Sequence, residues 1–455
     1  MGSIRMSLGG IKPIREKVQL VILGSGWGVY EVLRGVDKKR CDVTMISASS
    51  HFNFTSLLAS RAVGTLEFRC VVEPVRRYAP QATAFQAWCD KIDFKQKTLT
   101  CVPANPPPSY YERPQHVPSS VSEVPSAVLK LRLATQAQLV TAKPRKEFTV
   151  HYDKLVIAVG CYSQMFSIPG VKDYGYFLKD VRDARAIRSR ILECFEEASQ
   201  PTLSDIDRCN LLNFCIVGAG PTGIEFAAER HYGEKLARLV RINLYDVADC
   251  VLSGSERGLA QYAEKKFARD EINVKLKHYV ERVEDGVLYV KEQGEDKEKF
   301  AFFLDLQIEK DLRTGSLLTD NYLHAIRTDG TIDESVWAIG DCSVIKDQPL
   351  PATAQVAFQK AKYTTRALNR LVWDRPITEP FEFRNQGNLA YLGDWKALYD
   401  TSKVKAEIEE RNDSRLAWLL WRSAYFTRTL SIRNKITVPY YWFLNWIFGR
   451  DITRF

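Results

Sequence analysis

Residues 18–29 read Val-Gln-Leu-Val-Ile-Leu-Gly-Ser-Gly-Trp-Gly-Val, a short apolar run that ends at Gly24 and Gly26. A helix-compatible stretch follows from Trp27 to Val36, and a second apolar run extends from Cys41 to Ser47. A strand, a glycine turn, a helix and a second strand form the βαβ unit typical of dinucleotide-binding domains. The opening of the chain therefore predicts an α/β fold with a nucleotide site at its first glycine turn.

The same pattern returns in the middle of the chain. An apolar strand at residues 213–217 leads into Gly218-Ala-Gly220-Pro221-Thr222-Gly223, and a helix is expected from there to about Val240. A strand at residues 241–245 then ends beside Asp246, 23 residues after Gly223. This spacing is typical of the carboxylate that binds the ribose hydroxyls of NAD(H) and repels the 2′-phosphate of NADP(H). Two βαβ openings predict two nucleotide-binding domains.

The first glycine loop departs from the full fingerprint. Its third glycine position holds Val29, with Gly28 one residue early, and its second strand ends in Ser47-Ala48-Ser49 without a carboxylate. Glycine at the third position allows the helix to pack closely on the strand. We therefore expect Val29 to push the helix away from the strand.

Composition excludes several protein classes. The chain has 455 residues, of which 45% are hydrophobic and 26% charged, as in a folded protein of two or three domains. Its ten cysteines include no Cys-x-x-Cys pair and do not cluster with the six histidines, which disfavours metal sites and redox dithiols. No run of 18 apolar residues occurs, so a spanning helix is not expected, and the first 17 residues lack the apolar core of a secretory signal.

Five further segments have a readable pattern. Residues 103–126 are rich in Pro and Ser and predict a surface excursion, whereas residues 176–200 have helical spacing. Asp285-Gly286 between β-rich flanks predicts a hairpin, and residues 204–210 are expected to be a linker. A last buried strand, residues 336–339, ends at Gly340-Asp341.

The last 45 residues concentrate aromatic and basic side chains. Residues 411–455 hold eight Lys and Arg against two Asp and Glu, within an overall net charge of +9. Aromatic rings interleaved with cations suit a lipid surface, so we predict peripheral membrane attachment. A terminal helix pair packed on the body, or a dimer face, is the alternative. Nucleic acid binding is disfavoured because no base-reading module accompanies the charge.

Short motifs along nearly the whole chain resemble those of the type II NADH dehydrogenases, most closely the mitochondrial NADH:ubiquinone oxidoreductases of fungi. The resemblance rests on Leu23-Gly-Ser-Gly-Trp27, Phe52-x-Phe54-Thr55-x-Leu57-Leu58, Val63 to Arg69, Tyr152 to Gly160, Gly220 to Glu229, Ala338-Ile-Gly-Asp341, Leu350 to Ala357 and Trp442 to Phe455.

This resemblance implies two Rossmann-like domains and a membrane-docking end. The FAD domain would comprise residues 18–210 and 328–390, the NADH domain residues 211–327, and the C-terminal region residues 391–455. FAD would contact Gly24, Gly26, Trp27, Thr55, Leu57, Gly340, Asp341, Ala354, Gln355 and Val356, and Gly160 would close the crossover between domains. NADH would contact Gly218, Gly220, Pro221, Thr222, Gly223, Glu225 and Asp246, and Gln355 and Gln359 are assigned as catalytic residues beside flavin and quinone.

The implied reaction transfers a hydride from NADH to FAD and then two electrons to ubiquinone, without proton pumping, at the mitochondrial inner membrane. The absence of a dithiol favours a diffusible electron acceptor such as a quinone. Two alternatives stay open. One is a flavin-dependent NADH oxidase or ferredoxin-type reductase; the other is an inactive, cofactor-poor membrane-bound paralogue, because residues 300–318 lack the turn that the family has there. A homodimer is also left open.

Overall fold

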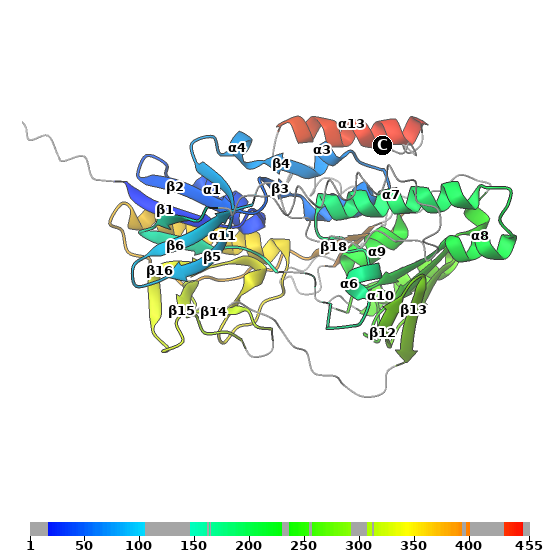
Figure 1. The fold of residues 1–455 in the computed structure, drawn as a ribbon. Helices are drawn as coiled ribbons and strands as arrows, with labels where there is room; N and C mark the ends of the chain where they lie inside the picture. The colour runs from blue at the N-terminus through cyan, green and yellow to red at the C-terminus, as the bar shows by residue number, and fades with distance from the viewer. Residues whose placement is uncertain are drawn as a thin grey trace, which may run out of the picture.

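A computed structural model describes residues 17–104, 146–161, 163, 165–229, 236–253, 257–292, 307–311, 314–393, 397–400 and 432–448. Figure 1 shows two lobes side by side, one built around a large sheet and the other around a small one, with helix α13 at the top of the view. The predicted surface excursion at 103–126 and the aromatic stretch 416–431 lie almost wholly outside the described residues.

The larger lobe is a ten-stranded sheet with the strand order β17-β14-β15-β16-β8-β1-β2-β5-β6-β7. Strands β1, β2, β8 and β16 run parallel at its centre, as the opening of the sequence predicts. The strands are β1 (Val18–Leu23), β2 (Cys41–Ser47), β5 (Thr83–Asp93), β6 (Thr98–Pro103), β7 (Phe148–His151), β8 (Lys154–Ile157), β14 (Leu317–Thr319), β15 (His324–Ile326), β16 (Ile332–Ala338) and β17 (Ser343–Ile345).

Both faces of this sheet are buried. Leu20 and Ile22 of β1 point into one core with α1 (Trp27–Gly35) and α11 (Ala354–Leu371), and Val21 and Leu23 point into a second core on the other face. Alternate residues of a central parallel strand point to opposite faces of the sheet, which is why residues 20–23 of β1 are all apolar. Val29 is completely enclosed in the first core while Tyr30 N still donates to Gly26 O, so the helix accommodates the β-branched side chain without losing its first turn.

The smaller lobe holds the second glycine loop. Strands β9 (Asn213–Val217), β10 (Arg241–Tyr245) and β11 (Ile272–Lys275) form a parallel sheet, and α9 (Pro221–Ala228) and α10 (Arg257–Arg269) pack on it. The predicted hairpin is confirmed as β12 (His278–Glu284) and β13 (Val287–Glu292), with Gly286 at a φ of +73°. The expectation that the helix runs to Val240 is wrong, because α9 ends at Ala228 and residues 237–239 form a separate 3₁₀ turn.

Several further elements complete the structure, and those within residues 51–78 lie along the chain between β2 and β5 of the larger lobe. The further elements are β3 (His51–Asn53), β4 (Val72–Pro74), α2 (Leu58–Ala62), α3 (Phe68–Val71), α4 (Val75–Tyr78), α6 (Val171–Tyr174), α7 (Val181–Ala198), α8 (Asp205–Leu211), β18 (Asn388–Tyr391) and β19 (Ala397–Asp400). The expected linker at 204–210 is instead helix α8, which Ser204 caps by accepting a hydrogen bond from Asp207 N.

The last described element, α13 (Ile432–Phe448), lies against α3 and β4, as Figure 1 shows. Arg433 donates to the carbonyl of Arg69 at 2.8 Å, and Asn434 donates to the carboxyl of Glu73 at 3.2 Å. Among the helices that the structure describes, none is both long and apolar enough to cross a lipid bilayer.

Candidate functional site

The first glycine loop has the geometry that a dinucleotide pyrophosphate needs. Gly24 has a φ of +111°, and a Cβ there would lie 2.3 Å from the carbonyl oxygen of Ala158, so only glycine fits. Gly26 is the N-cap of α1, with no side-chain cap and open space where its Cβ would point. The unpaired N–H groups of the first turn of α1 can therefore receive an anion.

Trp27 and Thr55 meet beside this loop. Trp27 Nε1 donates to Thr55 Oγ1 at 3.1 Å, and the indole ring packs edge-on against Phe52 and Phe54, with ring centroids 5.0 and 4.9 Å away. Both side chains are half-buried, so they retain surface for a ligand. Leu57, which the resemblance also assigns to FAD, is completely buried in the core on which Trp27 packs, so it has no surface for a ligand in this structure.

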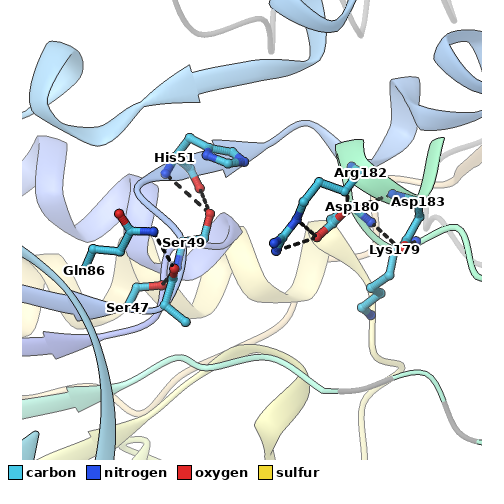
Figure 2. A network of polar contacts seen from close by, with 9 residues as sticks. Ser47, Ser49, His51, Gln86, Lys179, Asp180, Arg182 and Asp183 are labelled. Carbon is cyan, nitrogen blue, oxygen red and sulfur yellow. Dashed lines mark hydrogen bonds and ion pairs between the residues drawn. The ribbon is translucent and has the colours of Figure 1, made fainter. Parts of the chain in front are cut away.

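Strand β2 ends without a carboxylate. The polar side chains of Ser47, Ser49, His51 and Gln86 lie close together there, as Figure 2 shows. Ser47 Oγ accepts a hydrogen bond from Ser49 N at 3.2 Å, and Gln86 Nε2 donates to the carbonyl of Ala48 at 3.1 Å. Burial lowers the pKa of His51, while the neighbouring Asp180 opposes this shift. This end of the site is thus organised by hydroxyl, amide and neutral imidazole groups.

The third part of the first site comes from distant segments. Gly160 (φ +73°) follows β8, and Gly340 (φ +81°) opens the turn that carries Asp341. Cys161 Sγ donates to Asp341 Oδ2 at 3.7 Å, and Lys179 Nζ donates to Cys161 Sγ at 3.6 Å. Asp341, the carboxylate that the resemblance assigns to FAD, therefore lies beside the Cys161 thiol, which in turn contacts the Lys179 ammonium group. The sequence motifs did not indicate either neighbour.

The second glycine loop is built like the first. Gly218 has a φ of +108°, and a Cβ on Gly223 would lie 1.9 Å from the carbonyl oxygen of Gly218, so the helix can approach the loop only with glycine there. Gly220 caps α9 without a side chain, Pro221 occupies its first turn, and Gly220, Pro221 and Thr222 are all exposed. The open end of α9 is a second anion-binding position.

Asp246 lies next to this loop, as its spacing predicts. Its carboxylate accepts hydrogen bonds from the backbone N–H groups of Ala219, at 2.5 Å, and Ala248, at 2.8 Å. Two oxygens offer about four acceptor positions, so two remain for ribose hydroxyls. Asp246 thus anchors the glycine loop and retains acceptor capacity for a ligand.

Glu225 lies on α9 one turn beyond the loop. It is only 6% exposed, and its Oε1 accepts a hydrogen bond from Tyr391 N of β18 at 3.4 Å. The side chain therefore faces the seam between α9 and β18, and its place beside the nicotinamide stays a prediction.

Gln355 and Gln359 are both engaged by backbone. Gln355 donates to Gly387 O at 3.1 Å and accepts from Gln386 N at 3.2 Å, and Gln359 donates to Arg384 O at 2.8 Å and accepts from Arg384 N at 3.0 Å. The two amides hold residues 384–387 against α11, next to half-buried Ala354 and buried Val356. This geometry supports a positioning role, and the catalytic role of the two glutamines stays a prediction.

Two buried polar residues near these sites were given no role by the sequence motifs. Lys360 of α11 is 1% exposed and donates to the carbonyl and hydroxyl oxygens of Ser343, at 3.1 and 3.3 Å. Glu229, at the end of α9, is 5% exposed and bonded to residues of the other lobe. Burial of a charged residue type can only be known from the tertiary structure. Over the described part of the chain, no cluster of three or more His, Cys, Asp or Glu could hold a metal ion.

Comparison with known proteins decides the family. The model of the pyridine nucleotide-disulphide oxidoreductases matches residues 18–361, and that of the NDH2 C-terminal domain matches residues 385–451. The chain belongs to the type II NADH dehydrogenases of the pyridine nucleotide-disulphide oxidoreductase family. A probable NADH dehydrogenase of Dictyostelium discoideum is 34% identical, with 97% of this chain and 92% of that protein covered.

Other relatives and solved structures agree. The mitochondrial internal alternative NAD(P)H-ubiquinone oxidoreductase A1 of Arabidopsis thaliana is 31% identical, with 98% of this chain and 88% of that protein covered. NDH2 of Plasmodium falciparum in complex with NADH has the same fold, with a TM-score of 0.77, 20% identity, and coverage of 96% of this chain and all of that chain. The two-lobed α/β architecture of this type II NADH dehydrogenase is thus confirmed.

The residues present fit the two cofactors of the family, FAD and NADH. Each glycine loop has a glycine at positive φ, an uncapped helix N-terminus and open space in front of its second glycine. Asp341 and Asp246 would supply the carboxylates for the ribityl and ribose hydroxyls. Gly24, Gly26, Trp27 and Thr55 would hold FAD, and residues 218–223 would hold NADH.

Proposed function

We infer that this chain is a non-proton-pumping NADH:ubiquinone oxidoreductase of the mitochondrial inner membrane. The net reaction is NADH + H⁺ + ubiquinone → NAD⁺ + ubiquinol, in which NADH loses two electrons and the quinone gains two electrons and two protons. The observation that carries this inference is the pair of uncapped glycine loops, one in each lobe, in a chain whose relatives are named NADH-ubiquinone oxidoreductases.

The protein's part in this reaction is to bind, orient and exclude water. FAD, when bound, accepts the hydride of NADH and passes two electrons to the quinone. The Trp27–Thr55 hydrogen bond and the surrounding aromatic rings fix one wall of the flavin site. Asp246 would orient the adenosine ribose of NADH. Stacking the two ring systems converts a bimolecular step into an intramolecular one.

The outward face of α13 supports a lipid-facing role. Val438 and Trp442 are buried in the core that also contains Leu57 and Phe52, whereas Ile436, Tyr440, Phe443, Ile447 and Phe448 are 50–78% exposed. The helix thus has one face packed on the core that contains Phe52 and Leu57, and an apolar face toward solvent. An apolar face rimmed by aromatic residues is suited to the headgroup region of a bilayer.

Activity and cofactor content test the proposed reaction together. The purified protein should show flavin absorbance bands that NADH bleaches, and it should oxidise NADH with a short-chain ubiquinone under nitrogen. Comparable turnover with oxygen in place of quinone would instead support the NADH oxidase alternative. A protein without flavin bands would support the cofactor-poor paralogue.

Liposome flotation tests the lipid-facing role of α13. The double variant Ile436→Asp/Phe443→Asp should lose binding to vesicles that contain anionic lipid, whereas Val287→Asp, at an exposed apolar residue of the other lobe, should bind as the parent does. If the double variant still floats with the vesicles, α13 does not carry the attachment. If it instead changes from dimer to monomer in solution without any vesicle effect, the face is a homodimer contact.

A further inference from the structure

Helix α9 connects the two cofactor sites physically. Its N-terminus is the second glycine loop, residues 218–223, and its last residue, Ala228, is followed directly by Glu229. The eight residues of α9 span about 12 Å and are joined by backbone hydrogen bonds along the helix. Whatever holds Glu229 therefore also sets the position of the NADH loop.

Glu229 is hydrogen-bonded to two residues, Ser60 and Thr65, that follow Thr55 closely in the chain. Its Oε1 accepts a hydrogen bond from Ser60 Oγ at 2.7 Å, and its Oε2 accepts one from Thr65 Oγ1 at 3.2 Å. Ser60 is 4% exposed and lies on α2, which begins directly after the turn Thr55–Leu57. Since Thr55 receives the hydrogen bond from Trp27, these contacts join the end of α9 to the wall of the flavin site.

Neither burial nor the helix itself favours a carboxylate here. Negative charge at a helix C-terminus opposes the helix dipole, and a buried carboxyl loses its hydration. A second contact nevertheless fixes the same helix end from another side. A Cβ on Gly393 would lie 2.6 Å from the carbonyl oxygen of Ala228, so the segment after β18 packs directly against it. The C-terminal end of α9 therefore contacts Ser60 and Thr65 on one side and Gly393 on the other.

We propose that Glu229 is a positioning residue for hydride transfer, which sets the distance between the nicotinamide and the flavin by bonding α9 to Ser60 and Thr65. Hydride transfer requires reacting atoms about 3–3.5 Å apart, and a displacement of about 1 Å can cost about a hundredfold in rate. The reach of the side chain is what matters, because each oxygen must span from α9 to a hydroxyl of the other lobe. This proposal rests on the oxidoreductase activity described above.

Conservative variants of Glu229 distinguish the effect of side-chain length from the effect of charge. Glu229→Gln keeps the length and can still pair with both hydroxyls, since an amide oxygen accepts and an amide N–H donates. Glu229→Asp keeps the charge but is one methylene shorter. We expect single-turnover flavin bleaching at saturating NADH to stay within about threefold of the parent in Glu229→Gln and to fall tenfold or more in Glu229→Asp and Glu229→Ala. Glu196→Ala, at an exposed acid of α7, is the matched control.

Substitution of the two hydroxyl residues that bind Glu229, Ser60 and Thr65, provides an independent test. The double variant Ser60→Ala/Thr65→Val should slow flavin bleaching as Glu229→Ala does, and combining all three changes should add little, because they remove the same contacts. FAD content and the midpoint of urea unfolding, measured on every variant, report a merely structural role. If Glu229→Ala unfolds earlier but bleaches at the parent rate, or if Glu229→Asp is fast and Glu229→Gln slow, the proposal is wrong. A parent protein that NADH does not bleach would instead refute the activity.

Discussion

The buried lysine of α11 yields a prediction whose size follows from the structure. Lys360 is almost completely enclosed, and among the described residues its ammonium group donates hydrogen bonds to the carbonyl and hydroxyl oxygens of Ser343. Burial lowers the pKa of Lys360 from 10.5 to about 8, although the neighbouring Cys342 and Asp341 oppose this shift. We predict that Lys360→Met removes a pH-dependent part of the stability.

The sign and size follow from the two pKa values. The unfolded chain keeps the proton up to about pH 10.5 and the folded chain only to about pH 8, so between these values the unfolded state binds more protons. Stability therefore rises with pH across this window in the parent protein. The difference 10.5 − 8 corresponds to about 3 kcal/mol, of which about 2.5 kcal/mol should be recovered between pH 7 and pH 10.

Urea unfolding followed by circular dichroism at several pH values measures this effect. The free energy of unfolding of the parent, minus that of Lys360→Met, should increase by about 2.5 kcal/mol from pH 7 to pH 10. A constant offset from the lost hydrogen bonds to Ser343 does not affect this change. Lys362→Met, an exposed lysine of the same helix, should run parallel to the parent. If Lys360→Met also runs parallel to the parent, the ammonium group is not desolvated as the structure implies.

Three further predictions concern the nucleotide loop and a pair of thiols. Gly223→Ala places a Cβ against the carbonyl oxygen of Gly218, so the KM for NADH should rise at least tenfold while FAD content is unchanged. Asp246→Asn should raise the ratio of NADPH to NADH turnover, and an unchanged ratio would contradict the ribose assignment. Cys89 and Cys101 are directly opposite each other on the antiparallel strands β5 and β6, so the two-electron thiol oxidant diamide should link them into a disulfide. Peptide mapping without reductant should detect this link, and Cys101→Ser should abolish it.

Much of the fold could be predicted from local patterns. Both glycine loops follow apolar strands in the sequence, and Gly24, Gly218 and Gly223 occupy backbone positions that no other residue fits. The spacing of Asp246 likewise predicted its place beside the second loop. Such signals are readable because a tight turn and a buried strand constrain neighbouring residues of the chain.

Local sequence patterns predicted the start of the helix after the second glycine loop but not its end. The helix after the second loop was predicted to reach Val240 but ends at Ala228, because its N-terminal signal carries no information about where it stops. Val29 is enclosed by the surrounding core, and the displacement of α1 expected from its β-branched side chain stays a prediction. Whether a side chain fits depends on neighbours from β8, β16 and α11, which are distant in sequence.

The sequence by itself determined the two nucleotide-binding openings, since each depends on residues only a few positions apart. Only the tertiary structure decided which side chains meet: Glu229 with Ser60 across the lobes, Cys89 with Cys101 across two strands, and Gln355 and Gln359 with the backbone of 384–387. These contacts join residues separated by up to 169 positions. The physical reason is that hydrogen bonding and burial depend on distance in space, which the order of residues along the chain does not specify.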